Sequence, residues 1–107
     1  MIIDNEVVLA SASPRRRFLL GQIVRKLEFI SLDTDESFDP ATPKKEVATL
    51  LAKRKMDDAL SRGIQGIVVT ADTIVVLDDE ILGKPADANE AKKMLGMLSG
   101  NEHTVVT

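Results

Sequence analysis

The chain has 107 residues, of which 44% are hydrophobic and 29% charged, with a formal net charge of -3 and no cysteine. This composition is typical of one soluble domain, excludes disulfides and thiolate zinc sites, and gives no general attraction to nucleic acid polymers. The sequence has no apolar run near the roughly 20 residues of a membrane span and no basic leader, so we expect a cytoplasmic protein that does not contact membranes.

The first predicted elements are a strand and the helix that follows it. Residues 7–10 (Val-Val-Leu-Ala) form a short apolar run typical of a buried strand. Ser13 is a good N-cap, and Pro14 suits the first position of a helix. Apolar residues of this helix recur at helical spacing: Leu20, Ile23, Val24 and Leu27. The segment therefore predicts a strand that leads directly into a helix N-terminus.

Three arginines, Arg15, Arg16 and Arg17, follow in the first turn of this predicted helix. The free N–H groups of a helix N-terminus carry roughly half a positive charge, so each arginine there costs about a few tenths of a kcal/mol unless an anion is bound. Arginine binds phosphate oxygens with two donors at once, and the hydroxyls of Ser11 and Ser13 add neutral donors. The segment predicts a polyphosphate site; an exposed basic turn is the alternative.

The next predicted elements are a strand, a polar loop and a longer helix. Residues 28–32 alternate as a strand does, and residues 33–43 are polar with two prolines. We expect Thr42 to be the N-cap of the second helix, Pro43 its first residue, and about Leu60 its end.

An apolar stretch that reads as sheet comes after this helix. Residues 67–70 and 74–77 are apolar and are separated by Ala-Asp-Thr at 71–73. Asp78 and Asp79 predict a turn into a further strand at residues 80–82.

The last predicted elements are a third helix and a strand at residues 103–107. Asp87 and Glu90 resemble a capping box at the start of this helix. Its apolar face is formed by Ala91, Met94, Leu95 and Leu98. The order β-α-β-α-β-β-α-β predicts an α/β domain with a mixed sheet flanked by helices. Because the pattern stops within an apolar strand, we interpret residues 1–107 as a single α/β domain that is truncated; a domain that ends on an edge strand is the alternative.

Asp72 is the second candidate for chemistry, because a carboxylate between two apolar runs lies close to the core. An isolated buried carboxylate either takes a raised pKa or is held ionised by a cation, and both are typical of functional sites. Ligands of open α/β sheets bind at the carboxyl ends of strands, where Ser11 and Asp72 could both lie. A structural aspartate at a strand bend is the alternative.

Two lysines and one glutamate complete the candidates. Lys55 falls in the middle of the apolar face of the second helix, from which it either extends to the solvent or reaches a phosphate. Lys84 stands in a Gly-Lys-Pro loop, where a lysine is usually solvated. Glu36 lies in an acidic loop, and together with Asp72 it would offer two carboxylates to Mg²⁺.

Four motifs occur in the order of a known family: Leu-Ala-Ser-Ala-Ser-Pro-Arg-Arg, Thr-Ala-Asp-Thr-Ile-Val-Val-Leu, Leu-Gly-Lys-Pro and Leu-Ser-Gly-Asn-Glu-His-Thr-Val-Val-Thr. Across essentially all 107 residues the chain resembles the Maf family. The resemblance implies a fold similar to that of inosine triphosphate pyrophosphatases. It also implies a nucleoside triphosphate pyrophosphatase linked to septum formation.

The resemblance assigns a role to each candidate residue. Those that match substrate-binding positions are Ser11, Ser13, Arg15, Arg16, Lys55, Thr73 and Lys84. Asp72 matches the proton acceptor, and Glu36 the family's acidic residue, which with Asp72 would hold Mg²⁺ or Mn²⁺. Arg15 and Thr73 match specificity positions, and Ala-Asp-Thr resembles the branch that acts on dTTP and UTP rather than on 7-methyl-GTP.

The resemblance implies hydrolysis between the α and β phosphates to a nucleoside monophosphate and pyrophosphate. The family normally continues for about as many residues again, including a segment that faces the base. Two alternatives therefore stay open, which are a non-catalytic nucleotide-binding module and an inactive fragment that needs a partner. An open sheet edge would favour a homodimer.

Overall fold

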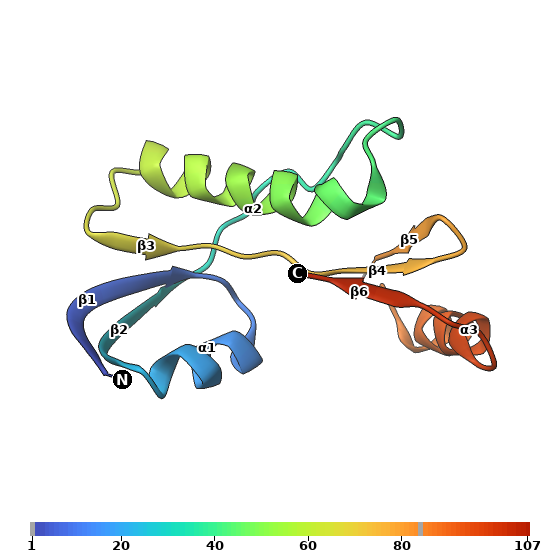
Figure 1. Ribbon diagram of the computed structural model, residues 1–107, viewed down its shortest axis with the longest axis horizontal. Coiled ribbons are helices and arrows are strands. Elements are labelled where there is room, and N and C mark those ends of the chain that lie inside the picture. The colour runs from blue at the N-terminus through green and yellow to red at the C-terminus, as the bar shows by residue number, and fades with distance from the viewer. Residues whose placement is uncertain (1, 84) are drawn as a thin grey trace.

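Six strands and three helices alternate along residues 2–83 and 85–107, which are the residues that the computed structural model describes (Figure 1). In chain order they are β1 (Ile3–Ala10), α1 (Pro14–Gly21), β2 (Val24–Ile30), α2 (Lys44–Ser61), β3 (Ile67–Val69), β4 (Ile74–Leu77), β5 (Glu80–Leu82), α3 (Ala88–Leu98) and β6 (Thr104–Val106). The predicted α/β class is confirmed. The parallel and antiparallel strands belong to two separate three-stranded sheets.

The first sheet is parallel and has the order β2-β1-β3. β1 lies in the middle, with Val8 opposite Glu28 on one side and Val68 on the other. Helix α1 covers one face of this sheet and α2 the opposite face (Figure 1). Because both faces are covered, the last four residues of β1 are all buried, which explains the unbroken apolar run at residues 7–10.

The second sheet is antiparallel and has the order β5-β4-β6. The predicted turn between β4 and β5 is confirmed at Asp78 and Asp79, whose φ angles are 48° and 66°. Positive φ at both central residues is the geometry of a two-residue hairpin turn that matches the twist of its strands. Aspartate adopts this left-handed conformation more readily than most residues.

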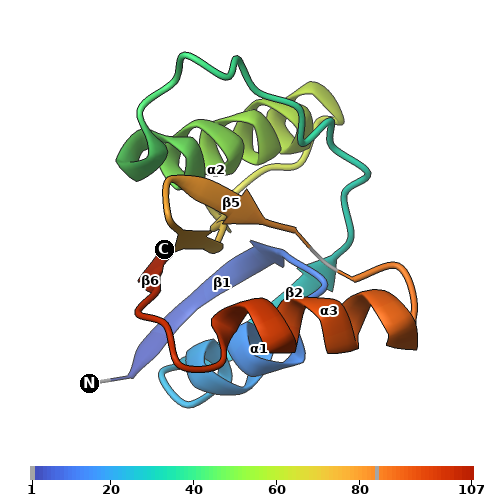
Figure 2. The ribbon, with the colours of Figure 1, turned by 90° about the vertical axis from the view of Figure 1, so that its right-hand side faces the viewer.

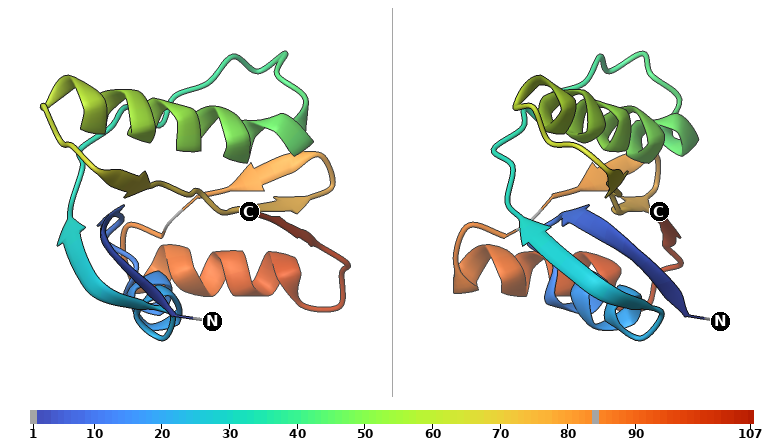
Figure 3. Two further views of the ribbon diagram at one scale, coloured as in Figure 1. Left: turned by 60° about the vertical axis from the view of Figure 1, so that its left-hand side comes forward. Right: turned by 90° about the vertical axis from the view of Figure 1, so that its left-hand side faces the viewer.

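The predicted break at residues 71–73 separates two strands of different sheets rather than two parts of one strand. β3 and β4 run end to end beneath α2 (Figure 3), but β3 pairs with β1 whereas β4 pairs with β5 and β6. The chain therefore passes from one sheet to the other at residues 70–73.

Helix α2 joins the two halves. Its buried residues Val47, Ala48 and Leu51 form one cluster with Ile74 of β4. Partly buried side chains from the loop and the second sheet pack around this cluster: Phe38, Val76, Ile81 and Val106. Figure 2 shows α1 and α3 on the side of the two sheets opposite to α2.

None of the helices within the described residues combines the length and apolar character that crossing a bilayer requires.

The predicted extent of the first helix is wrong. Helix α1 ends at Gly21, and Ile23 lies between α1 and β2, whereas Val24 and Leu27 belong to β2. Pairing of this segment with β1 satisfies its backbone groups with a partner that helical periodicity cannot reveal.

The predicted N-cap of the second helix is also wrong. The cap position is Pro43, which provides no side-chain hydrogen bond, and Lys44 is the first helical residue. The N–H of Thr42 instead donates to the carbonyl of Asp39 at 2.8 Å, so Thr42 belongs to the preceding turn. Local turn formation has moved the helix start by one residue.

The predicted N-cap of α3 is confirmed at Asp87, whereas the return hydrogen bond differs from that of a capping box by one residue. The Asp87 carboxylate accepts the N–H of Glu90 at 2.8 Å, and the Glu90 carboxylate accepts the N–H of Ala86 at 3.3 Å. The predicted apolar face is only partly correct, because Leu95 is 67% exposed. The side that faces β5 carries Met94 and Met97, which line a cavity of about 450 Å³ between the two elements. Helix α3 is therefore loosely packed.

Candidate active site

The end of β1 and the start of α1 form a loop held by two serine hydroxyls. Ser11 is 6% exposed, and its Oγ accepts the N–H of Ser13 at 3.2 Å. The Oγ of Ser13 accepts the N–H of Arg16 at 3.3 Å, which confirms Ser13 as the N-cap. Both hydroxyls therefore shape the helix N-terminus.

Arg16 connects this loop to the segment between the two sheets. Its Nη1 donates to Ser11 Oγ at 3.2 Å and to the carbonyl oxygen of Ala71 at 3.3 Å. Its Nη2 donates to Thr73 Oγ1 at 2.7 Å. A single guanidinium thus spans the residues on either side of Asp72, which agrees with the expectation that the ends of β1 and β3 lie together.

Lys55 and Asp72 form an ion pair beside Arg16. Lys55 Nζ lies 3.0 Å from Asp72 Oδ1 and donates to the carbonyl oxygen of Ala71 at 3.2 Å. The side chains are 15% and 11% exposed respectively, so the carboxylate has the cationic partner that its burial requires. Thr70 Oγ1 donates to the carbonyl oxygen of Ala52 at 2.9 Å and so attaches the same segment to α2.

Thr107, which was not among the predicted site residues, joins this group. Its Oγ1 lies 3.1 Å from Thr73 Oγ1. The pairing of Ile74 with Val106 in the second sheet brings the neighbouring Thr73 and Thr107 together. A contact between two threonine hydroxyls that depends on strand register cannot be predicted from the sequence of either segment.

The three arginines of α1 have three different environments. Arg16 is committed to the Asp72 segment, whereas the guanidinium of Arg17 lies 4.7 Å from the ring centroid of Phe29 in β2. Arg15 is exposed and forms no hydrogen bond or ion pair with any described residue. Of the three, Arg15 is the one that can turn toward a bound anion without breaking a contact.

Glu36 is exposed in the loop before α2, and no contact among the described residues joins it to Asp72. The loop around it is ordered by Ser37, whose N–H and hydroxyl donate to the Asp35 carboxylate, each at 2.9 Å. The Ser37 N–H and then its hydroxyl hold the pKa of Asp35 below the usual value, with a smaller contribution from Arg54. Arg54 of α2 also donates to the carbonyl oxygens of Asp35 and Ser37.

Two predicted features lack a structural test. Lys84 lies outside the described residues. Within the described part of the chain no three His, Cys, Asp or Glu side chains come together as a metal site, so a metal would depend on Asp72 with Glu36 or on oxygens from a ligand.

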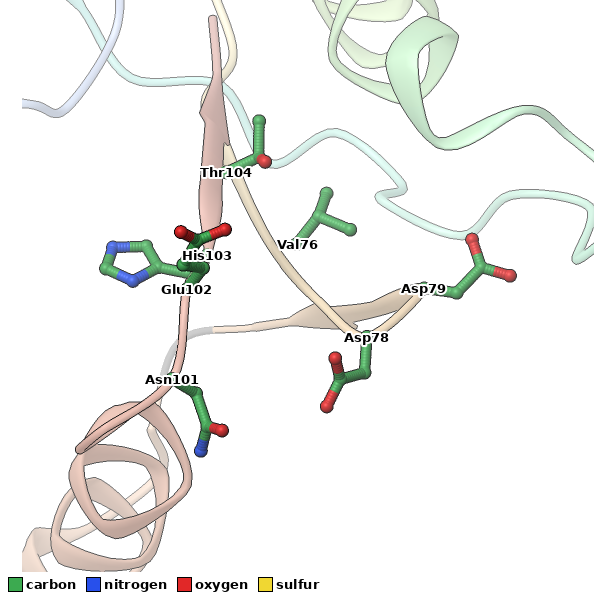
Figure 4. Close-up of a pocket in the computed structure, with 7 residues that line it drawn as sticks. All are labelled: Val76, Asp78, Asp79, Asn101, Glu102, His103 and Thr104. Carbon is green, nitrogen blue, oxygen red and sulfur yellow. The ribbon is translucent and has the colours of Figure 1, made fainter.

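A cavity of about 620 Å³ opens elsewhere, between the β4–β5 turn and the segment before β6 (Figure 4). Its lining residues are Val76, Asp78, Asp79, Asn101, Glu102, His103 and Thr104. None of the predicted site residues lines it, and Figure 4 shows the carboxylates of Asp78 and Asp79 pointing in different directions. The Asp72 group is therefore the better candidate for an active site.

Several proteins similar to this chain have the same name. A dTTP/UTP pyrophosphatase of Ruminiclostridium cellulolyticum is 48% identical over 105 residues, which cover 96% of this chain and 54% of that protein. Proteins of the same name from Anaeromyxobacter dehalogenans and Thermococcus gammatolerans are 46% and 44% identical, and the matches cover 94% of this chain and 50% and 53% of those proteins. The chain thus spans about half the length of the curated relatives it matches. The family model for Maf-like proteins matches residues 6–107, and the chain belongs to this family.

Proposed function

We propose that the protein hydrolyses a nucleoside triphosphate, dTTP or UTP, to the monophosphate and pyrophosphate. The single observation that carries the proposal is the convergence of Arg16 and Lys55 on the segment that holds Asp72. Relatives that are 42–48% identical to this chain are named dTTP/UTP pyrophosphatase, which supports the same reaction and the same two substrates.

Binding of the triphosphate is assigned to the α1 N-terminus and the cations around it. Arg15 is exposed and available, and the Ser11–Ser13 loop presents the helix N-terminus at the end of β1. Arg16 uses three of its five N–H groups in contacts with the described residues, and the other two are assigned to phosphate oxygens. Lys55 adds a positive charge beside Asp72, and the proposal includes Lys84 as a further phosphate ligand.

Asp72 is assigned as the proton acceptor. It takes a proton from a water molecule whose oxygen forms a bond to the α-phosphorus, while the bond between this phosphorus and the α–β bridging oxygen breaks and pyrophosphate leaves. Lys55 holds Oδ1 of the carboxylate at 3.0 Å, and Oδ2 has no partner among the described residues. The free oxygen is therefore the one that would accept the proton.

A divalent metal fits the same residues by donor chemistry. Mg²⁺ and Mn²⁺ prefer carboxylate and phosphate oxygens, and Asp72 and Glu36 each supply a carboxylate. We propose Asp72 and Glu36 as its protein ligands. When bound, the metal would neutralise charge on the triphosphate.

The test is pyrophosphate release from a panel of nucleoside triphosphates with Mg²⁺ or Mn²⁺, comparing the unsubstituted protein with Asp72→Asn. We expect turnover of dTTP or UTP and a rate at least about 100-fold lower in Asp72→Asn, because a general base contributes on that order. Unchanged turnover in Asp72→Asn would contradict the assignment of the proton acceptor. A rise in the thermal midpoint with nucleotide but no pyrophosphate release would instead support a non-catalytic nucleotide-binding module.

The proposal also covers the cellular process, the location and the partners of the protein. The family resemblance supports a link to septum formation and a cytoplasmic location, and the net charge of -3 supports the absence of a nucleic acid polymer as partner. Exposed apolar side chains support a homodimer: Phe18, Leu19, Leu95 and Val105. Light scattering would test it, with a monomer mass contradicting the dimer.

A further inference from the structure

Thr107 directly follows β6 and contacts the candidate active site without a role in the proposed reaction. Its Oγ1 lies 3.1 Å from Thr73 Oγ1, and Thr73 is the residue after Asp72. Both threonines are exposed, so neither is needed to fill the core.

The direction of one hydrogen bond at Thr73 follows from the chemistry of its partner. A guanidinium only donates, so Thr73 Oγ1 accepts from Arg16 Nη2 at 2.7 Å. The same oxygen exchanges a second hydrogen bond with Thr107, in which either hydroxyl can donate. Thr73 Oγ1 is therefore held between Arg16 on one side and Thr107 on the other.

This chain of hydrogen bonds connects both halves of the molecule across Asp72. Residues 70–73 belong to neither a helix nor a strand, so sheet pairing does not hold their backbone. Before Asp72, the carbonyl oxygen of Ala71 accepts from Arg16 and Lys55. After Asp72, the Thr73 side chain provides the corresponding attachment, and Thr107 links it to the end of β6.

We propose that Thr107 is a positioning residue of the hydrolase. Through Thr73 and Arg16 it holds Asp72 in place, and it contacts neither the substrate nor the transferred proton. This inference rests on the proposed function. Because misplacement of a reacting group by about 1 Å costs up to roughly 100-fold in rate, loss of this contact should lower kcat more than it raises KM.

The experiment compares Thr107→Val, which removes the hydroxyl at similar volume, with Thr107→Ser, which keeps it. With dTTP or UTP as substrate we expect kcat of Thr107→Val to fall about 10-fold with KM changed less than about twofold, and Thr107→Ser to keep most of the activity. Equal kcat in all three proteins would overturn the proposal. A rise in KM alone would also overturn it, since that result indicates substrate binding.

Thr104→Val is the matched control, because Thr104 is an exposed threonine at the start of β6 and has no hydrogen-bonding side-chain partner among the described residues. We expect it to leave kcat unchanged. Adding Thr107→Val to Thr73→Val should produce no further loss, because Thr107 acts through Thr73. Additive losses would contradict this route.

A readout that needs no turnover separates this inference from the proposed function. If the unsubstituted protein releases no pyrophosphate from any triphosphate, the proposed function fails, whereas amide hydrogen exchange at Asp72 and Thr73 still tests the contact. We expect faster exchange in Thr107→Val than in the unsubstituted protein and in Thr107→Ser. Identical exchange in all three would overturn the positioning role.

Discussion

The parallel and antiparallel halves of the molecule differ in how completely they are covered. The last four residues of β1 in the parallel sheet are all buried, between α1 and α2. Helices α1 and α3 each bury no residue, but within the antiparallel sheet the buried residues are Ile74 and Leu77, both from β4. The first half has a core covered on both faces, whereas the second depends on α2 for most of its burial.

The candidate active site lies where these two halves meet. Ser11, Ser13 and Arg16 come from the well-packed half, and Lys55 comes from the helix that covers both sheets. Asp72 stands on the segment that passes between the sheets, and Thr107 comes from the loosely packed half. The difference predicts that core substitutions in the first half act on stability, and that those at the junction act on activity, with a loss of stability as well where a buried charge loses its partner.

The largest expected effect is on the core of the parallel sheet. Leu9 is 2% exposed, and Leu9→Ala should lower the free energy of unfolding by about 2–5 kcal/mol through lost burial and a cavity. Leu95→Ala in α3 is the matched control and should change it by less than about 0.5 kcal/mol. Urea denaturation measures both, and similar losses in the two variants would contradict the contrast between the halves.

The next largest effect concerns the ion pair at the junction. Lys55→Met leaves the Asp72 carboxylate largely buried without its cation, and we expect the free energy of unfolding to fall by about 2–3 kcal/mol, below the range for fully buried pairs because water reaches these side chains. Lys55→Arg keeps the charge and should retain more of the stability. Thermal and urea unfolding test this prediction, and a stability of Lys55→Met equal to that of the unsubstituted protein would contradict it.

A smaller effect should distinguish the two neighbouring arginines. Arg16→Lys loses the planar fork that reaches Ala71 and Thr73 together, so kcat should fall about 10-fold. Arg15→Lys keeps an exposed cation and should alter KM by no more than a few-fold. Steady-state kinetics with dTTP or UTP separate the two, and a larger loss of kcat in Arg15→Lys than in Arg16→Lys would contradict the positioning role of Arg16.

The smallest effect is expected at the start of α3. Asp87→Ala removes the N-cap hydrogen bond to Glu90, which is worth about 1 kcal/mol of helix stability. Because α3 is loosely packed, the loss should appear as fraying of this helix, with little change in the unfolding midpoint. Amide exchange along residues 88–98 measures it, with Asp87→Asn as a control that keeps a capping oxygen.

The sequence correctly predicted the helix starts that are set by side chains only a few residues apart. Ser13 with Pro14 placed the start of α1, and Asp87 with Glu90 placed the start of α3, because a capping side chain acts over three residues. The same reasoning failed at Thr42 and at Ile23 to Leu27. In the second case a distant strand, β1, decided that the segment pairs as a strand instead of continuing the helix.

The candidate site divides in the same way. The sequence alone indicated Asp72 as a carboxylate near the core and Lys55 as a cation on an apolar helix face, since residue type and periodicity determine both. The tertiary structure decided their contact at 3.0 Å. It also decided that Arg16 contacts Ala71 and Thr73, which are distant in the sequence, and that Thr107 joins the site. These contacts depend on strand order and register, which arise from packing of the whole chain and leave no local signal in the residues that form them.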